Sequence, residues 1–192
     1  MILVDTGPLV ALFDPQDEQH NRCRGTLKEI HEPILTTTPV LTEAFHMLGP
    51  ASIGSDRLRE FVEDGGLSMW FFDRAWLTRA FELMELYADH PMDLADASLI
   101  AAAEAVGTRK VFTIDRKDFE TYRVRRGHRH YPVEILSGLR SSWFRSPAQP
   151  CAVRQDIAGK PNLIVGRDTA KWPFQICLNR GETPGFAVSD KG

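Results

Sequence analysis

The sequence predicts an α/β protein in which helices cover both faces of a central parallel sheet, giving three layers. Short apolar or β-branched runs alternate with longer segments of helical periodicity from the first residue to about residue 136. Parallel strands joined by helices are buried on both faces, which explains why these runs are almost wholly apolar. A length of 192 residues is enough for one such domain and a further segment.

The first part of the chain gives three expected strands with helices between them. Residues 2–4 are apolar and lead into Asp5, and Pro8 fits the first turn of a helix. Residues 33–38 are rich in β-branched side chains, which favour a second strand, and a helix follows over 39–48. The remaining expected elements here are helices over 17–31 and 55–64 and a third strand over 67–72.

The second part of the chain repeats this alternation. Residues 74–88 have apolar side chains at helical spacing. The clearest helical pattern covers 93–105, where a run of small residues is ended by a glycine. Residues 110–114 form a fourth strand that leads into Asp115, and a last strand is expected within 131–136.

The composition changes near residue 136. Residues 1–136 contain 15 Lys and Arg and 22 Asp and Glu, a net charge of −7, whereas residues 137–192 contain 8 and 4, a net charge of +4. The second segment has five prolines and no sustained periodicity, although residues 162–165 are a candidate strand. We therefore expect a folded domain over 1–136 and a poorly ordered C-terminal extension over 137–192.

The expected location of the protein is the cytoplasm. No apolar run approaches the roughly 20 residues needed to cross a bilayer, and the first residues lack a signal-peptide pattern. The three cysteines lie far apart and lack metal-ligand spacing. Such a sparse, odd set fits a reducing compartment better than a disulfide framework.

Four acidic residues are expected to meet at one edge of the sheet. Asp5 and Asp115 each follow a strand, while Glu43 and Asp96 lie in the early turns of helices entered near the same edge. Carboxylate oxygens are the ligands that Mg²⁺ and Mn²⁺ prefer. Because clustered carboxylates repel one another unless a cation neutralises them, the pattern predicts a divalent-metal site.

Each acid also has a structural interpretation that stays open at this point. Asp93 and Asp5 are positioned to cap a helix, Asp115 to begin a turn, and Glu43 to lie on a solvated helix face. Asp93 lies three residues before Asp96, so both side chains can project from one face of the helix. A metal site explains all four acids at once. The structural interpretation needs a separate explanation at each position.

Four segments of the sequence carry a family resemblance. They are MILVDTGPLV (1–10), TTPVLTE (37–43), MDLADASLI (92–100) and VFTIDRKDF (111–119). In order and spacing they resemble the PIN-domain proteins, and within them the ribonuclease toxins of VapBC-type toxin–antitoxin pairs. The resemblance covers residues 1–136. It implies a PIN-like α/β/α fold and endonucleolytic cleavage of RNA that depends on Mg²⁺ or Mn²⁺.

The resemblance also assigns roles to individual acids. The family's four acidic positions fall on Asp5, Glu43, Asp96 and Asp115. In the mechanism this implies, Asp5 and Asp96 hold a metal, and Glu43 and Asp115 are direct or water-mediated ligands. The metal activates a water that attacks phosphorus in line.

Three further residues take supporting roles in the resemblance. Asp93 matches an additional acid of some family members and is a possible metal ligand. Thr6 falls where a hydroxyl often supports the site, and Asp118 is a peripheral carboxylate.

A domain with a net charge of −7 needs local positive charge to hold RNA. The candidate is the basic segment over residues 109–129, which flanks Asp115, and the alternative is a solvated loop. Tyr122 and Tyr131 are candidates for stacking on unpaired bases. The candidate RNA-binding side chains are Arg109, Lys110, Arg116, Lys117, Arg123, Arg125 and Arg126.

The resemblance implies two protein partners. One is a second copy in a homodimer, and the other is a cognate antitoxin whose C-terminal peptide occupies the site and presents a basic side chain to the carboxylates. Two other functions remain open on the sequence alone. The domain can be a catalytically inactive RNA- or protein-binding module of this fold, or a two-metal phosphoesterase acting on DNA or a small phosphate ester.

Overall fold

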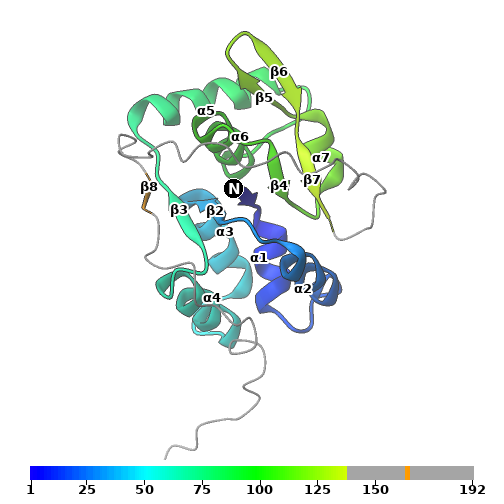
Figure 1. The fold of residues 1–192 in the computed structure, drawn as a ribbon. Helices are drawn as coiled ribbons and strands as arrows, with labels where there is room; N and C mark the ends of the chain where they lie inside the picture. Colours follow the sequence, from blue (N-terminus) through cyan, green and yellow to red (C-terminus); the bar gives the residue numbers. More distant parts are fainter. Residues whose placement is uncertain (138–162, 165–192) are drawn as a thin grey trace, which may run out of the picture.

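The central sheet places the first strand of the chain in its middle. The structure is a computed structural model that describes residues 1–137 and 163–164. Its main sheet has the strand order β7-β4-β1-β2-β3-β8 (Figure 1). The strands are β1 (Ile2–Val4), β2 (Ile34–Thr37), β3 (Ser68–Trp70), β4 (Lys110–Phe112), β7 (Glu134–Leu136) and β8 (Leu163–Ile164). All are parallel except β8, which pairs antiparallel with β3.

Helices cover both faces of this sheet. Figure 1 shows α1 to α4 below the sheet, and α5 and α6 above it. The expected three-layer fold with a parallel centre is therefore confirmed. The helices are α1 (Thr6–Phe13), α2 (His20–Glu29), α3 (Thr38–Leu48), α4 (Ile53–Glu63), α5 (Arg74–Leu86), α6 (Leu94–Val106) and α7 (Arg116–Thr121).

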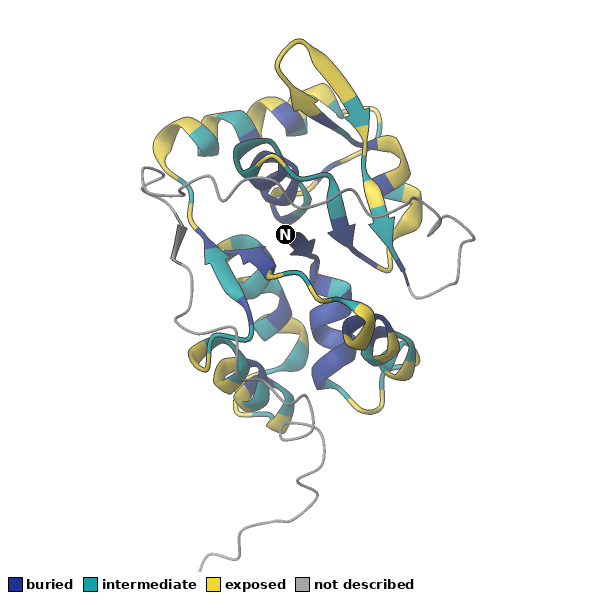
Figure 2. Ribbon diagram, viewed as in Figure 1, coloured by how far each residue is buried: buried dark blue, intermediate teal, exposed yellow. Residues whose placement is uncertain are grey.

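The core is continuous across the middle strands, as the dark colouring in Figure 2 shows. Leu3 of β1 pairs with Leu35 of β2 on one side and Val111 of β4 on the other, and all three are fully buried. Four alanines of α6 are fully buried as well, namely Ala97, Ala101, Ala102 and Ala103. Small side chains let a helix lie close to a sheet, so α6 is held directly against the strands that carry the acids.

The segment over 109–129, for which the sequence left open a solvated loop and strand edge, has more regular structure than a loop. It contains α7 and a separate antiparallel hairpin, formed by β5 (Arg123–Arg126) and β6 (Arg129–Pro132). Gly127 begins the two-residue turn with a φ of 60°, a left-handed value that glycine adopts without strain. The strand expected over 131–136 is in fact two strands, because the chain leaves the hairpin at Pro132 and enters the main sheet at Glu134.

Most of the expected C-terminal extension, residues 138–162 and 165–192, lies outside the described residues. The candidate strand at 162–165 corresponds to β8, which extends the sheet next to β3. Ser137 is held by two arginines, since its carbonyl accepts hydrogen bonds from Arg22 and its hydroxyl accepts one from Arg116. In the part of the chain that the structure describes, no helix is long and apolar enough to cross a membrane.

Candidate metal centre

The carboxyl ends of β1 and β4 lie side by side and bring Asp5 close to the segment that carries Asp115. Val4 pairs with Phe112, and the backbone N–H of Asp5 donates to the carbonyl of Phe112 at 3.0 Å. The backbone of Asp5 is therefore fixed at the carboxyl end of β1. Thr113 lies between the two acids, because its hydroxyl donates to Asp5 Oδ2 at 2.7 Å and accepts from the Asp115 N–H at 2.9 Å.

Asp5 is a buried carboxylate with a polar partner on each oxygen. Its Oδ1 caps α1 by accepting from the Thr6 N–H at 2.7 Å, and Thr113 donates to Oδ2. Burial nevertheless raises the pKa of Asp5 to about 6, because desolvation outweighs these hydrogen bonds and the charges of Glu43 and Asp93 add to it. Each carboxylate oxygen has two lone pairs, so both remain able to bind a cation.

Asp96 lies in the first turn of α6 and is coupled to Asp5. Burial raises the pKa of Asp96 to about 8, and the negative charges of Asp5 and Asp93 contribute next. The phenol of Tyr122 donates to Asp96 Oδ2 at 3.0 Å, which favours the ionised form without offsetting the burial. The ionised forms of Asp5 and Asp96 thus repel one another.

Glu43 reaches the same place from α3. The hydroxyl of Thr6 donates to Glu43 Oε2 at 2.7 Å, which ties the first turn of α1 to the middle of α3. Glu43 also raises the pKa of Asp5 through its charge. Thr6 therefore supports an acid of the site, as the resemblance implied, and it does so by orienting Glu43.

The remaining acids cap helices. Exposed Asp93 caps α6 by accepting from the Asp96 N–H at 2.8 Å, and exposed Asp115 caps α7 by accepting from the Asp118 N–H at 3.1 Å. Asp118 pairs with His90 at 2.9 Å. The capping interpretation thus holds for Asp93, as it does for Asp5, and Asp115 caps α7 where a turn was expected. The charge of Asp93 still acts on Asp5 and Asp96. Asp115 is linked to Asp5 through Thr113 alone.

The donor set fits a hard divalent cation. Within residues 1–137, no Lys or Arg forms an ion pair with Asp5, Glu43, Asp93 or Asp96. No group of three His, Cys, Asp or Glu side chains among the described residues is arranged to hold a metal ion directly. Mg²⁺ usually keeps several waters and binds through one or two carboxylates, so a pair such as Asp5 and Asp96 is sufficient.

The family model of the PIN domain matches residues 2–124. The chain belongs to the PIN-domain family. The match covers every acid of the site and ends within β5, so it includes β1 to β4 and all seven helices named above but not β6, β7 or β8.

Individual PIN-domain relatives agree with this assignment. The chain is 24% identical over 126 residues to ribonuclease VapC26 of Mycobacterium tuberculosis (strain ATCC 25618 / H37Rv), a match that covers 64% of this chain and 92% of that protein. The crystal structure of M. tuberculosis VapC20, described as a sarcin-ricin loop cleaving toxin, superposes with a TM-score of 0.57 at 16% identity, over 62% of this chain and 92% of that one. A toxin–antitoxin complex from Klebsiella pneumoniae gives 0.51 at 18% identity, over 63% and 92%.

Sequence reasoning missed several residues beneath the acids of this PIN domain. Thr113 and Tyr122 are fully buried and donate to Asp5 and Asp96. Below them, the hydroxyls of Thr37 and Ser98 form a buried hydrogen bond of 2.5 Å that joins β2 to α6. The position of Thr113, directly after a buried strand, was a usable signal. Tyr122 was expected to stack on an unpaired base, which is wrong because its side chain is fully buried and its phenol donates to Asp96, 26 residues away.

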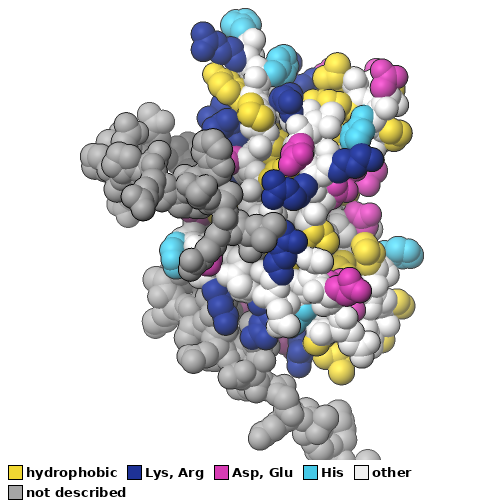
Figure 3. All heavy atoms as spheres, turned by 90° about the vertical axis from the view of Figure 1, so that its right-hand side faces the viewer, with side chains coloured by type: hydrophobic (Ala, Val, Ile, Leu, Met, Phe, Trp, Pro, Cys, Tyr) yellow, Lys and Arg dark blue, Asp and Glu magenta, His cyan; other side chains and the backbone are white. Residues whose placement is uncertain are grey.

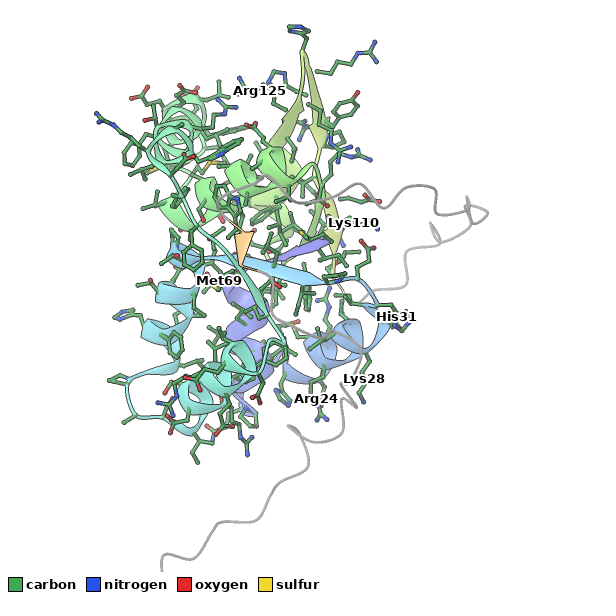
Figure 4. All side chains as sticks on the ribbon, turned by 60° about the vertical axis from the view of Figure 1, so that its left-hand side comes forward. Arg24, Lys28, His31, Met69, Lys110 and Arg125 are labelled. Carbon is green, nitrogen blue, oxygen red and sulfur yellow. The ribbon has the colours of Figure 1, made fainter. Side chains whose placement is uncertain are left out.

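The predicted RNA-binding side chains of the PIN domain do not form one patch. Lys110 pairs with Glu32 at the amino end of β4, and Figure 4 shows it well apart from Arg125 of the hairpin. Arg116 and Lys117 begin α7 beside Asp115. Most of the others are engaged: Arg109 with Glu134, Arg116 with Ser137 and Glu120, Arg123 with backbone carbonyls, Arg125 with Glu104, and Arg126 with the carbonyl of Gly107.

Proposed function

We propose that this PIN domain is a metal-dependent endoribonuclease and the toxin of a toxin–antitoxin pair. The observation that carries the proposal is the meeting of Asp5, Glu43 and Asp96 at one edge of the sheet, where burial and neighbouring negative charge raise the pKa values of Asp5 and Asp96. Among the described residues no Lys or Arg pairs with these acids, so their burial costs stability, which points to function. The choice of RNA as substrate is supported by the similarity to the ribonuclease VapC26.

The acids have distinct tasks in this proposal. Asp5 and Asp96 are the direct ligands of Mg²⁺ or Mn²⁺, and Glu43, oriented by Thr6, accepts a hydrogen bond from a water of the metal's hydration shell. Asp115 acts at the rim. A divalent cation in such a site lowers the pKa of a bound water and neutralises charge on the scissile phosphate. Asp93 adds negative charge to the site and so strengthens its attraction for a cation. Asp118 lies one helical turn after Asp115 and is peripheral.

Two residues hold these ligands in place. Thr113 fixes one oxygen of Asp5, and Tyr122 fixes one oxygen of Asp96, so the free lone pairs of both carboxylates point in defined directions. Both donors are fully buried, and their hydrogen bonds therefore do not compete with bulk water. The chain thus supplies a preorganised pair of ligands.

Arg116 and Lys117 are suited to hold the RNA backbone near the acids. Both are exposed at the start of α7, one and two residues after Asp115. Positive charge next to Asp115 in the chain reduces the repulsion between an RNA phosphate and the carboxylates. The other predicted basic residues lie further from Asp115 along the chain and are not assigned to the cleavage step.

The antitoxin and the homodimer belong to the same proposal. Several large apolar side chains are exposed on and beside α3, α4 and α5, a pattern that protein partners cover. They are Met47, Ile53, Phe71, Phe81 and Leu86. The toxin assignment is supported by the similarity to a VapC ribonuclease. A basic side chain of the antitoxin would pair with Asp5 and Asp96 and compete with the metal.

The test compares the purified full chain with its Asp96→Asn variant. Each protein is incubated with total RNA, a short single-stranded RNA and a DNA of the same sequence, in Mg²⁺, in Mn²⁺ and in EDTA. We expect RNA cleavage by the parent in either metal, loss of cleavage in EDTA, and a loss of at least about 100-fold in the variant. Matched thermal unfolding curves establish that the variant is folded.

The other outcomes identify the other functions. Cleavage of DNA in preference to RNA would assign the site to a deoxyribonuclease. Binding of RNA without cleavage in any metal, by protein free of a co-purified antitoxin, would make the domain a binding module. Cleavage by the Asp96→Asn variant at the parent rate would remove Asp96 from the mechanism.

A further inference from the structure

The β5–β6 hairpin presents positive charge on a surface that the main sheet does not cover. Figure 3 shows Lys, Arg and His side chains gathered at the upper end of the molecule, over the hairpin. Arg126 and Arg129 lie directly opposite one another at its tip and are exposed, and His128 and His130 extend the exposed strand. Arg109 lies over the ring of Tyr131 at 5.5 Å, on the same face of the hairpin as the tip arginines. We call Arg109, Arg126 and Arg129 the arginine cluster.

Like charges directly opposite one another on two strands destabilise a hairpin. Among the described residues, no Asp or Glu forms an ion pair with Arg126 or Arg129, and the nearest acid to Arg109 is Glu134 at 4.0 Å. The hairpin is nevertheless held firmly at its base. Val124 is fully buried, and the Arg125 N–H donates to the buried carboxylate of Glu104. A rigid base with an uncompensated basic tip is suited to bind a polyanion.

The hairpin is connected to the metal centre by a direct physical path. Tyr122, just before β5, contacts Asp96 in the first turn of α6, and Arg126, at the end of β5, contacts the carbonyl of Gly107 just after α6. β5 therefore runs along α6 from the acids to the arginine cluster. Eleven residues separate Asp96 from Gly107, which corresponds to roughly 16 Å along the helix. A stacked nucleic-acid strand covers that distance in about five nucleotides.

We infer that the arginine cluster is a second contact for the RNA backbone, about five nucleotides from the scissile phosphate. This inference rests on the proposed function for the identity of the polyanion. The cluster takes phosphates, and Tyr131 with Arg109 offers a flat surface for an unstacked base. RNA long enough to reach both places is held at two points, whereas a very short RNA is held only at the acids.

The test measures RNA binding in Ca²⁺, which takes oxygen ligands and lets the acids hold a phosphate, and scores only RNA that a gel shows to be intact. Fluorescence anisotropy follows single-stranded RNAs of about 4 and about 20 nucleotides across a salt series. The parent is compared with Arg126→Gln/Arg129→Gln. The matched control is Lys28→Gln/Arg59→Gln, which removes two exposed positive charges from α2 and α4, in the layer on the other face of the sheet. Thermal unfolding verifies that all three proteins fold.

The hairpin variant should bind the 20-nucleotide RNA roughly 10- to 30-fold more weakly at 0.1 M salt, with a salt slope lower by about 1.4. The control variant should keep most of the parent's affinity for the 20-nucleotide RNA. The affinity for the 4-nucleotide RNA should be the same for all three proteins. An unchanged slope for the hairpin variant would overturn the inference. Poly-glutamate is measured as a second polyanion. If the hairpin variant lost binding to poly-glutamate but kept its binding to RNA, the inference would also be overturned, because the surface would then bind an acidic protein segment. Failure of the parent to cleave RNA would contradict the proposed function and leave this measurement valid.

Discussion

The acids of the metal centre lie in an environment that opposes their own ionisation. Burial and neighbouring charge raise the pKa of Asp96 to about 8 and that of Asp5 to about 6, well above the ordinary value of 3.8. A raised folded-state pKa means that the folded protein binds more protons than the unfolded chain between about pH 4 and pH 8. The free energy of unfolding of the metal-free protein therefore falls as pH rises through that range.

Asp96→Asn should raise the stability of the metal-free protein, and more so at high pH. Near pH 4 both forms are uncharged at this position and should melt alike. At pH 8 the variant should have a Tm roughly 2–4 °C or more above the parent, because it avoids the cost of ionising Asp96. Its amide oxygen still accepts the Tyr122 hydrogen bond. Thermal unfolding in EDTA at the two pH values measures the difference in Tm. A variant less stable than the parent at pH 8 would contradict the claim that ionising Asp96 destabilises the folded protein.

Tyr122→Phe should weaken metal binding without unfolding the domain. The ring stays buried among Tyr87, His90 and Phe119, but Asp96 loses the donor that orients one of its oxygens. We expect a loss of metal affinity of about 10-fold, the scale typical of residues that orient a ligand.

The matched control is Tyr87→Phe, which removes a hydrogen bond from the Arg123 N–H outside the site. Calorimetric titration with Mn²⁺ measures both variants. Equal affinities for the two would mean that Tyr122 only fills space.

The positions of the acids could be predicted from sequence because each lies at the end of a strand or early in a helix, and in a parallel sheet such positions meet at one edge. Asp5 and Asp115 follow strands, and Asp96 lies in the first turn of a helix. Their hydrogen-bond donors could not be predicted in the same way. Thr113 reaches Asp5 across 108 residues and Tyr122 reaches Asp96 across 26, and only the assembled sheet determines such pairs.

At the scale of elements, one buried carboxylate joins α5, α6 and β5. Glu104 accepts two hydrogen bonds from Arg79 at 2.9 Å, and the Arg125 N–H donates to it at 3.2 Å. Only 4% of the Glu104 side chain is exposed, so its charge depends on these donors. The hydrogen bonds fix the base of the hairpin to the two helices.

Glu104→Gln should therefore destabilise the domain by about 3 kcal/mol, because it leaves the largely buried Arg79 with only the exposed carboxylate of Glu82 as its counter-charge. Glu82→Gln is the control, since Glu82 also pairs with Arg79 but is largely exposed. It should cost about 0–1 kcal/mol. Urea unfolding of both variants gives the comparison, and equal losses would show that burial of Glu104 contributes nothing.

The hairpin and the short helix α7 were not predicted from the sequence. The hairpin strands are rich in arginine and histidine and have few apolar residues, so the period that identifies a strand is weak. Val124 and Tyr131 are paired across it and supply its packing, but two residues make no readable pattern. By contrast, the alanine-rich run of α6 gave a clear prediction, and the helix begins one residue after its expected start because Asp93 is the cap.

At the scale of the whole molecule, metal binding and proton release should be linked. Asp96 must ionise to act as a ligand, so the affinity for Mn²⁺ should increase with pH up to about 8. The Tm gain on adding a few millimolar Mn²⁺ should therefore be larger at pH 8 than at pH 6. Asp96→Asn should reduce this pH dependence to the part that Asp5 contributes, and a parent whose gain is the same at both pH values would contradict the prediction.

The order of strands also sets when activity appears during synthesis. β1, made first, lies between β2 and β4, and the metal centre is incomplete until Phe112 has paired with Val4. About 110 residues separate Asp5 from Asp115, which takes roughly 5–20 s to translate. A nascent chain that ends before β4 contains Asp5 without Thr113 or Asp115. Under the proposed function, RNA cleavage would therefore begin only when the chain is nearly through the domain.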